Sequence, residues 1–586
     1  MRPRGFALRL SSVLVPLLLL GWLGYCVAGQ NRPAPAPELP GSAPRQRQEG
    51  DFLVSNVPER VTALNPFTTV SSTAQRMILR YTHDALLDLD PKDAKVRPAL
   101  ATLQGRSKDG LVHEFVLRDG VTFSDGMPLT LEDVRFSFEV VKNPGVPAGS
   151  LHDVLEVVAD FAAHDAKRFA VRLAQPYFAG IEEVGVAWRV MQKKWFLAEV
   201  ARRAMALGEA VPDPTSPRFG EILAKIACPG PGTGPYELVT EPGSAEPLTN
   251  SGKEILLVRS EKSWRRSAYP ACWNLAGMRL SFVLDETQEI ALLQQQRIDW
   301  WGRSNPSALL ERLPDLAASY ELRVFDSVSN GNYVVFWDCR KPALARSEVR
   351  RALTMCFDRR FLVESLLAGQ ARVAVSWFRP GAPPYPTDEQ PLPFDPPAAK
   401  ELLDGAAQAG APRLQRLVIG YPTGVEFYRV LLERAVPEFA KAGVEFVVQP
   451  VEFRVLLERF SKGELDGCAF LVSHTPWVDP HPWFHSSPPD GSGKNYGGYS
   501  NPEVDQVLDA ARAELDEAKR LALWRRFHAA FVRDQPATLL AHPRSAFLLH
   551  KRFRGVELGA MGLVPERWWV APEQRLWDEH GARITR

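Results

Sequence analysis

Residues 113–141 have the sequence HEFVLRDGVTFSDGMPLTLEDVRFSFEVV, and this stretch decides the kind of fold. Residues 113–117, which include Phe115 and Val116, predict a β-strand. Asp119-Gly120 is a typical hairpin turn, so residues 121–123 should continue as a second strand. The stretch therefore begins as a pair of short strands.

A helix should follow this strand pair at once. Asp125-Gly126 marks a second turn, and Thr130 can cap a helix with Asp133 three residues further on. The apolar residues after the cap recur at helical spacing and share one face: Leu131, Val134, Phe138 and Val141. Strands and a helix in such quick succession indicate a mixed α/β chain.

The same alternation continues along the chain. The apolar pattern predicts strands at residues 236–239, 254–259, 333–337, 417–420 and 444–448. It also predicts a helix after Pro342 and another over residues 426–440, which Pro437 should kink or break near its end. Strands and helices mixed in this way favour an α/β body with open sheets.

Composition places the chain among ordinary folded proteins. Its 586 residues suggest roughly three or four domains. The apolar fraction is 45% and the charged fraction 24%, which excludes a mostly disordered chain. Lysine and arginine (70) nearly balance aspartate and glutamate (69). This balance argues against a general polyanion binder, so we expect no nucleic-acid partner.

The N-terminus has the features of an export signal. Arg2, Arg4 and Arg9 precede an apolar run over residues 10–29, and small residues at its end offer a cleavage site. A run of about 20 residues is also long enough to span a bilayer, so an uncleaved anchor is the second possibility. Lipidation at Cys26 is a third, although Tyr25 occupies a position where a lipobox has a small residue. All three place the rest of the chain outside the cytoplasm, in the periplasm or on the outer face of the membrane.

Residues 30–50 form a candidate linker. They are rich in proline, arginine, glutamine and alanine and contain almost no bulky apolar residues. Such a composition predicts a solvated, semi-extended tether, with the folded region beginning near Asp51.

Six segments in order carry a resemblance to a known family. Along the chain they are Leu64-Asn65-Pro66, residues 113–141, GTGPY at 232–236, LLQQQRID at 292–299, SEVRRALTMCFDRRFLVESLLAGQ at 347–370 and YSNPEVD at 499–505. Over roughly residues 51–545 the chain resembles the bacterial extracellular solute-binding proteins of family 5. These proteins, the peptide/nickel class, are the capture components of ABC importers.

The resemblance implies an α/β fold of the large, class II periplasmic-binding-protein type. Two lobes joined by hinge strands would close around a ligand. Lobe 1 would span residues 51–325, with an extra subdomain at about 91–230. Lobe 2 would span 326–540, and residues 541–586 would return to lobe 1.

The resemblance also points to a ligand-binding loop. Peptide-binding members commonly bind the peptide ammonium with an aspartate three residues before the Asp of an Asp-Pro pair. Here the pair is Asp479-Pro480, and the earlier position is Pro476. Either Asp479 takes over that role, or the ligand has no free amine there. Trp477 and His481 flank Asp479 and are further candidates for ligand contact.

Other candidate contacts come from both lobes. Asn65 and Phe67 lie where lobe 1 of the family lines its cleft, although Asn65 could instead form a turn before Pro66. Tyr421 and Arg429 follow a predicted strand at the start of a helix. Arg429 could pair with a carboxylate terminus, or it could be a solvated helix residue.

Three of the chain's 11 histidines are His474, His481 and His485. Imidazole and carboxylate groups suit nickel, copper or zinc, so a metal or metal-chelate site is one interpretation. The other is a proline-rich cleft loop, because the prolines make the spacing of His481 and His485 unlike a helical ligand pair.

The cysteines leave two possibilities. Cys339 could pair with Cys468, and Cys228 with Cys272, if their strands are neighbours. Burial as free thiols is the alternative.

We expect a binding protein rather than an enzyme, because no G-x-S-x-G or H-E-x-x-H motif occurs. The expected function is the capture of a peptide-like solute for an ABC permease, by a monomer without a cofactor. Binding of nickel or a metal chelate on the same scaffold, or a membrane-tethered solute sensor, are the alternatives.

Overall fold

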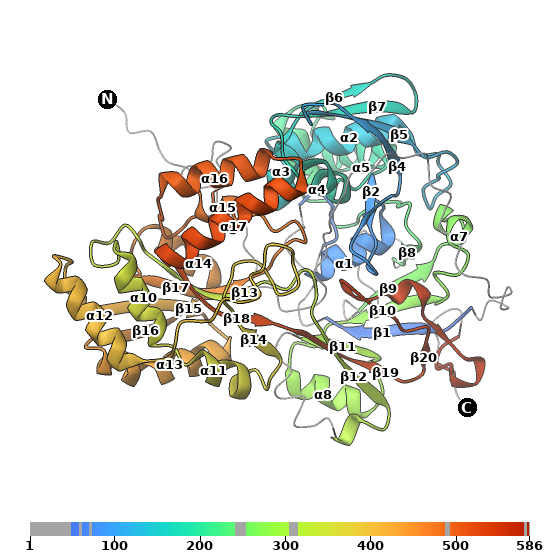
Figure 1. Ribbon diagram of the computed structural model, residues 1–586. Coiled ribbons are helices and arrows are strands. Elements are labelled where there is room, and N and C mark those ends of the chain that lie inside the picture. Colours follow the sequence, from blue (N-terminus) through green and yellow to red (C-terminus); the bar gives the residue numbers. More distant parts are fainter. Residues whose placement is uncertain are drawn as a thin grey trace. The chain divides into compact units, whose positions relative to one another are not determined.

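The computed structural model describes residues 49–57, 61, 63–68, 73–240, 254–303, 314–486, 493–578 and 583–584. The predicted signal, and nearly all of the predicted linker, lie outside these ranges. The chain forms two compact units. We call Ser329–Ser545 the central unit, and the described residues up to Val328 together with Ala546–Arg586 the N-terminal unit. Figure 1 shows the elements of both.

A seven-stranded mixed sheet forms the base of the N-terminal unit. In spatial order its strands are β12 (Tyr320–Phe325), β19 (Ser545–His550), β11 (Trp300–Arg303), β1 (Phe52–Asn56), β10 (Gly277–Ser281), β9 (Glu254–Arg259) and β8 (Tyr236–Leu238). β1 runs parallel to β10 and β11, and β19 runs antiparallel to β11. The helices of this part are α1 (Thr73–Thr82), α7 (Trp264–Ala268) and α8 (Glu286–Gln294).

A second, four-stranded antiparallel sheet belongs to the same unit. Its order is β4 (Ala101–Arg106), β5 (Val112–Leu117), β7 (Arg168–Leu173) and β6 (Val158–Ala163). Its helices are α2 (Leu131–Lys142), α3 (Ser150–Glu156), α4 (Gly180–Ala187), α5 (Lys193–Ala206) and α6 (Pro217–Leu223). The two longest, α2 and α5, contribute Phe136, Phe138 and Phe196 to one buried apolar core.

Short pairs complete the N-terminal unit. They are β2 (Leu87–Leu89) with β3 (Val96–Pro98), β20 (Phe553–Arg554) with β23 (Trp569–Val570), and β21 (Leu558–Gly559) with β22 (Gly562–Leu563). Two 3-10 turns, η2 (Pro565–Arg567) and η3 (Pro572–Gln574), lie between and after them.

The stretch at residues 113–141 folds largely as predicted. It supplies β5 and α2, and Thr130 and Asp133 form the capping box. The second strand at 121–123 was wrong, because Thr122 makes only an isolated bridge to Pro128. The turn at Asp125-Gly126 folds these residues onto themselves, with Phe123 N–H donating to the Met127 carbonyl oxygen at 2.8 Å. β5 pairs instead with β4 and β7.

The central unit contains a six-stranded mixed sheet. Its order is β14 (Ala371–Val373), β18 (Ala537–Pro543), β13 (Asn332–Trp337), β17 (Gly467–Val472), β15 (Arg416–Pro422) and β16 (Glu445–Val451). Its helices are α10 (Ser347–Met355), α11 (Arg359–Phe361), the π-helical η1 (Leu362–Leu366), α12 (Pro396–Gln408), α13 (Glu426–Lys441), α14 (Phe453–Ser461), α15 (His481–Phe484), α16 (Pro502–Ala513) and α17 (Glu517–Asp534).

Of the kink or break predicted at Pro437, the break does not occur in α13. The helix continues to Lys441. Pro437 lacks the N–H that an interior helical residue donates, but the turn after it is held by packing. Phe439 stacks on Phe446 of β16 with ring centroids 4.1 Å apart and meets Phe357 at 5.3 Å. These buried aromatic contacts offset the missing hydrogen bond.

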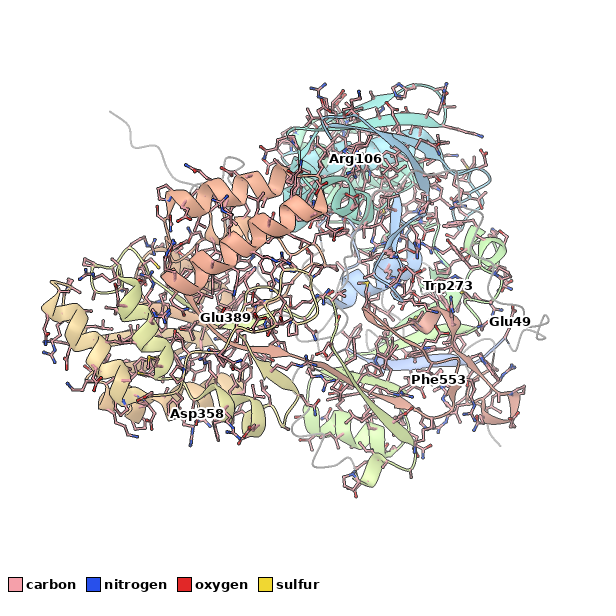
Figure 2. All side chains as sticks on the ribbon, in the orientation of Figure 1. Glu49, Arg106, Trp273, Asp358, Glu389 and Phe553 are labelled. Carbon is pink, nitrogen blue, oxygen red and sulfur yellow. The ribbon has the colours of Figure 1, made fainter. Side chains whose placement is uncertain are left out.

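One buried arginine ties the end of the N-terminal unit to its beginning. The Arg552 guanidinium pairs with Asp51 and binds both oxygens of Asp299, at 2.8 and 2.7 Å. It also donates to the Phe52 carbonyl oxygen at 2.8 Å and lies over the ring of Phe553, which Figure 2 labels. Asp299 accepts in addition from the backbone N–H of Val54 at 2.9 Å. β1, β11 and the returning segment therefore meet at one guanidinium.

No helix in the described ranges combines the length and the apolar character that a bilayer span requires. The apolar run at residues 10–29 lies outside those ranges, so its fate stays a prediction.

We predict that Arg552→Met destabilises the N-terminal unit by about 3–5 kcal/mol, because it leaves two buried carboxylates without their counterion. Chemical denaturation followed by tryptophan fluorescence measures the loss. Arg97→Met is the matched control in the same unit. Its side chain is 44% exposed and pairs with Asp93 on the surface, so its loss should cost less than about 1 kcal/mol. Equal effects of the two substitutions would contradict the role given to Arg552.

Candidate functional site

The strands of the central sheet bring several chain segments to one edge. β15 runs parallel to β16 and β17, so these three strands end on the same side. β13 is antiparallel to β17 and β18, so β13 begins there and β18 ends there. We call this side the carboxyl edge. Open α/β sheets bind ligands beyond the carboxyl ends of their strands, which makes this edge the candidate site.

A buried polar cluster lies at the carboxyl edge. Asn332, at the start of β13, donates from Nδ2 to the carbonyl oxygen of Trp377 at 2.8 Å. His474, two residues after β17, places Nε2 3.0 Å from the same carbonyl oxygen and 2.9 Å from Asn332 Nδ2. The His474 ring also meets the Trp377 ring edge-on at 5.1 Å. Strand ends and a loop thus hold one histidine in a fixed orientation.

A second histidine belongs to the same edge. His542, near the end of β18, has Nδ1 3.2 Å from the carbonyl oxygen of Gly331. Gly331 is required there, because a Cβ on it would lie 1.7 Å from the Val472 carbonyl oxygen. Because Gly331 has no side chain, β13 can begin directly against the end of β17. The carbonyl oxygen of Gly331 then lies within hydrogen-bonding distance of His542 Nδ1.

Several buried polar atoms of this edge have no hydrogen-bond partner among the described residues. They are Asn332 Oδ1, Trp377 Nε1, Trp477 Nε1 and His542 Nε2. A buried donor or acceptor left in this condition costs about 1–3 kcal/mol. The two indole N–H groups are donors, and Asn332 Oδ1 is an acceptor. The edge can therefore both donate hydrogen bonds to a ligand and accept them from it.

Both histidines of the edge are held neutral. Burial, together with the nearby His542, lowers the pKa of His474 to about 3. Burial likewise lowers the pKa of His542 to about 4, although its hydrogen bond to Gly331 works in the opposite direction. At neutral pH the edge therefore carries uncharged imidazoles.

Four residues predicted as ligand contacts lie on or directly after strands that end at the carboxyl edge. Tyr421 is in β15, opposite Pro450 of β16, and its side chain is buried. Trp477 and Asp479 lie in the loop after β17, and His481 begins α15. The structure thus gathers these four at one end of the sheet, where their contact with ligand stays a prediction.

Asp479 is already engaged within the central unit. Its Oδ1 accepts from the backbone N–H of His481 at 3.0 Å, and its Oδ2 lies 3.3 Å from Nε of Arg512. Only 7% of the side chain is exposed. The Arg512 guanidinium therefore compensates the carboxylate that the sequence offered as a partner for an ammonium group.

Arg429 lies on the surface of α13. Its guanidinium pairs with Glu426 and Glu433 on the same helix, and its side chain is 44% exposed. A contact between Arg429 and a ligand carboxylate stays a prediction.

Asn65 and Phe67 belong to the N-terminal unit. Asn65 donates from Nδ2 to the Leu223 carbonyl oxygen at 2.7 Å, and its Oδ1 accepts from the Phe67 N–H at 3.0 Å. Phe67 packs against Phe196, with ring centroids 5.2 Å apart.

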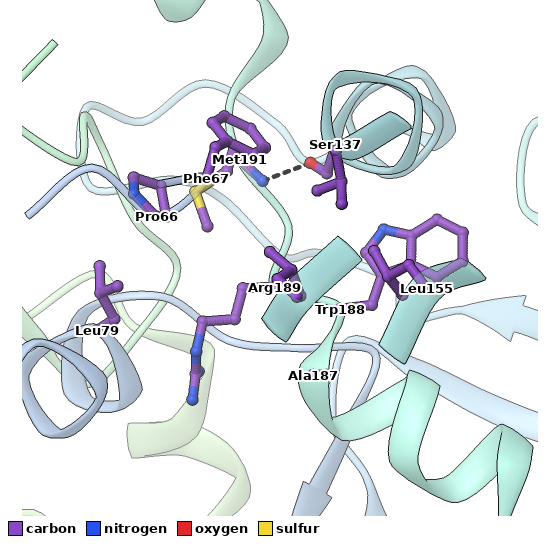
Figure 3. A pocket seen from close by; sticks show the side chains of 11 residues that line it. Pro66, Phe67, Leu79, Ser137, Leu155, Ala187, Trp188, Arg189 and Met191 are labelled. Carbon is purple, nitrogen blue, oxygen red and sulfur yellow. Dashed lines mark hydrogen bonds between the residues drawn. The ribbon is translucent and has the colours of Figure 1, made fainter. Parts of the chain in front are cut away.

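Phe67 also lines a small cavity of about 40 Å³, shown in Figure 3, beside Met191 and its backbone hydrogen bond to Ser137. Both Asn65 and Phe67 are buried. Their ligand contacts stay a prediction.

The sequence analysis missed Asn332, Trp377 and His542. Asn332 directly precedes a predicted strand, so its place at a strand end was recoverable. His542 lies in β18, for which no strand was predicted. Trp377 reaches the edge from a loop, and no sequence pattern around it predicted a place at the site.

All five cysteines in the described ranges are free thiols. The proposed pairs therefore do not form. Cys468 lies within β17, opposite Phe336, whereas Cys339 comes after β13 has ended. Burial raises the pKa of Cys339 to about 11 and that of Cys356 to about 12, which is typical of unreactive buried thiols.

Comparisons with known proteins match this architecture. The chain aligns over 567 residues with the oligopeptide-binding protein OppA of Bacillus subtilis at 21% identity, covering 94% of this chain and 97% of the relative. The solved structure of AppA from Bacillus subtilis with a nonapeptide matches with a TM-score of 0.69 at 19% identity, covering 90% and 100%. NikA of Brucella suis with Fe(III)-EDTA matches with a TM-score of 0.71 at 18% identity, covering 89% and 100%.

The fold is that of the two-lobed extracytoplasmic solute-binding proteins, as the resemblance implied. The model of the bacterial extracellular solute-binding proteins, family 5, matches residues 95–497. The chain therefore belongs to this family, whose members are transport proteins of the extracellular or periplasmic space.

We predict that the central unit loses stability as the pH falls below about 6.5, the ordinary histidine pKa. The folded state keeps His474 and His542 neutral, whereas the unfolded state binds a proton at each. Each group then removes about 1.4 kcal/mol per pH unit until its folded pKa is reached. Urea denaturation at several pH values from 7.5 to 4.5 measures this slope. His542→Gln should make the slope shallower, and an unchanged slope would contradict the assignment.

Proposed function

We propose that this chain is the capture component of an ABC importer. It binds a peptide-like solute at the carboxyl edge of the central sheet and delivers it to a membrane permease. Family membership supports the transport role, and relatives named for peptides support the class of solute. We further propose that it acts as an exported monomer, in the periplasm or at the outer face of the membrane.

The observation that carries the peptide proposal is the group of unpartnered polar atoms at the edge. A peptide backbone presents N–H donors and carbonyl acceptors in alternation, and it binds proteins chiefly through them. Asn332 Oδ1 is suited to accept from such an N–H, and Trp477 Nε1 is suited to donate to such a carbonyl. Each bond would remove the penalty of a buried polar atom without a partner.

The electrostatics of the edge favour a ligand held by its backbone rather than by its terminal charges. The two edge histidines are neutral, and Arg512 compensates Asp479. Pro476 occupies the position where the family resemblance implies an acidic residue for a peptide ammonium. We therefore propose an oligopeptide or a blocked peptide as the solute, with Tyr421 and Trp477 beside it.

Native mass spectrometry of the full-length chain, purified from a bacterial periplasm or membrane fraction without added ligand, tests the class of solute. We expect additional masses that correspond to short peptides, because a peptide captured during export can survive purification. A single increment with a nickel or iron isotope pattern would overturn the peptide proposal in favour of a metal chelate.

Trp477→Phe separates ligand binding from stability. We predict roughly tenfold weaker binding of an oligopeptide, the loss of one hydrogen bond of about 1–1.5 kcal/mol, with little change in the melting temperature of the free protein. The indole N–H has no partner among the described residues, so the free state loses no hydrogen bond. Isothermal titration calorimetry measures the affinity.

Trp568→Phe is the matched control for this experiment. Trp568 is also buried, and its Nε1 has no partner among the described residues, but it lies in the core of the N-terminal unit. Its substitution should leave the peptide affinity unchanged. Equal losses in both variants, or none in Trp477→Phe, would contradict the proposed contact.

A further inference from the structure

Two histidines of the central unit converge on one carboxylate. His481 begins α15, and His485 follows the end of this short helix. Their rings stack with centroids 4.6 Å apart. Nε2 of His481 lies 3.0 Å from Oδ1 of Asp509 on α16, and Nε2 of His485 lies 3.3 Å from the same oxygen. Within the described residues this is the one group of three potential ligands whose atoms all lie within 4.8 Å of one another.

These separations resemble those around a bound metal ion. Bonds of about 2.0–2.1 Å to a tetrahedral zinc ion place neighbouring ligand atoms roughly 3.3 Å apart. The two separations to Asp509 already have that size, and no pair of ligand atoms exceeds 4.8 Å. A small approach of the two imidazoles would close the site.

We propose that His481, His485 and Asp509 form a binding site for a divalent transition metal, with zinc the ion best suited to two imidazoles and one carboxylate. The ion would join α15 to α16. It would thereby fix the segment that directly follows the loop of Trp477 and Asp479. This proposal stands apart from the identity of the transported solute.

The burial of the three side chains suits such a site. The side chains of His481 and His485 are 2% and 8% exposed, so packing already holds both rings close to Asp509 before any ion arrives. The Asp509 side chain is 52% exposed, which gives the ion a path from solvent. The open side would leave room for a water molecule as the fourth ligand.

Arg512 opposes metal binding in a way that can be measured. Its Nη1 lies 3.4 Å from Nδ1 of His481, and its Nε lies 3.3 Å from Oδ2 of Asp479. A metal on Nε2 of a neutral His481 requires the proton to sit on Nδ1, which would then face the guanidinium. Metal binding should therefore move Arg512 away from His481, and removal of the arginine should tighten binding.

The test is a titration of the full-length chain with ZnCl₂ after treatment with a chelator and dialysis. We expect one zinc ion per chain and a higher melting temperature with zinc than without. Co²⁺ in place of zinc should give the visible absorption bands of a tetrahedral site. Asp509→Asn should weaken zinc binding on the order of tenfold or more and remove these bands. Arg512→Gln should bind zinc more tightly than the unsubstituted protein.

Glu503→Gln is the matched control. Glu503 is an exposed acid on the same helix, and it pairs with Arg533 rather than with a histidine. It should leave the zinc affinity unchanged. Because the half-exposed Asp509 can be changed without disturbing a core, the test does not depend on a histidine variant that could fail to fold. No zinc bound, or equal binding by Asp509→Asn and the unsubstituted chain, would overturn the proposal.

Discussion

The N-terminal unit depends on the ion pairs of Arg552. The chain leaves this unit at Val328 and re-enters it at Ala546, so the unit is assembled from two distant pieces. β19 joins them through the sheet, and the guanidinium of Arg552 joins them again through Asp51 and Asp299. A buried arginine with two carboxylates has little tolerance for misplacement, because any unpaired member is costly. It therefore fixes how the returning segment meets β1 and β11.

In the central unit, unlike at Arg552, not every buried polar atom has a hydrogen-bond partner among the described residues. At the carboxyl edge, strand ends and a tight approach at Gly331 hold imidazole and indole groups in place, yet several of their polar atoms have no partner among the described residues. Unpartnered atoms occur elsewhere in the chain, including Trp568 Nε1. At the edge, Asn332 Oδ1 and His542 Nε2 lie near the ends of the adjacent strands β13 and β18. Under the proposed function, a ligand that supplies partners for them would gain binding free energy.

Sequence patterns predicted the elements better than the site. Local sequence patterns located β5, α2 and α13, because such signals act within a few residues of the chain. Pro437 misled because its effect depends on Phe446, which lies in the next strand. The polar cluster of Asn332, Trp377 and His474 draws on three distant segments, and no local pattern encodes such a meeting. The family resemblance supplied the overall fold, which local patterns alone left at the level of an α/β body.

The compensation of Asp479 shows why a family motif transfers only in part. The family resemblance implies an acid near this loop that receives an ammonium group. Here Asp479 accepts from the backbone N–H of His481 and faces Arg512. An ammonium ligand would have to compete with a guanidinium that is 11% exposed and already placed. A ligand held by backbone hydrogen bonds meets no such competitor. The Asp479 carboxylate, which could otherwise pair with a free N-terminus, is thus paired inside the central unit.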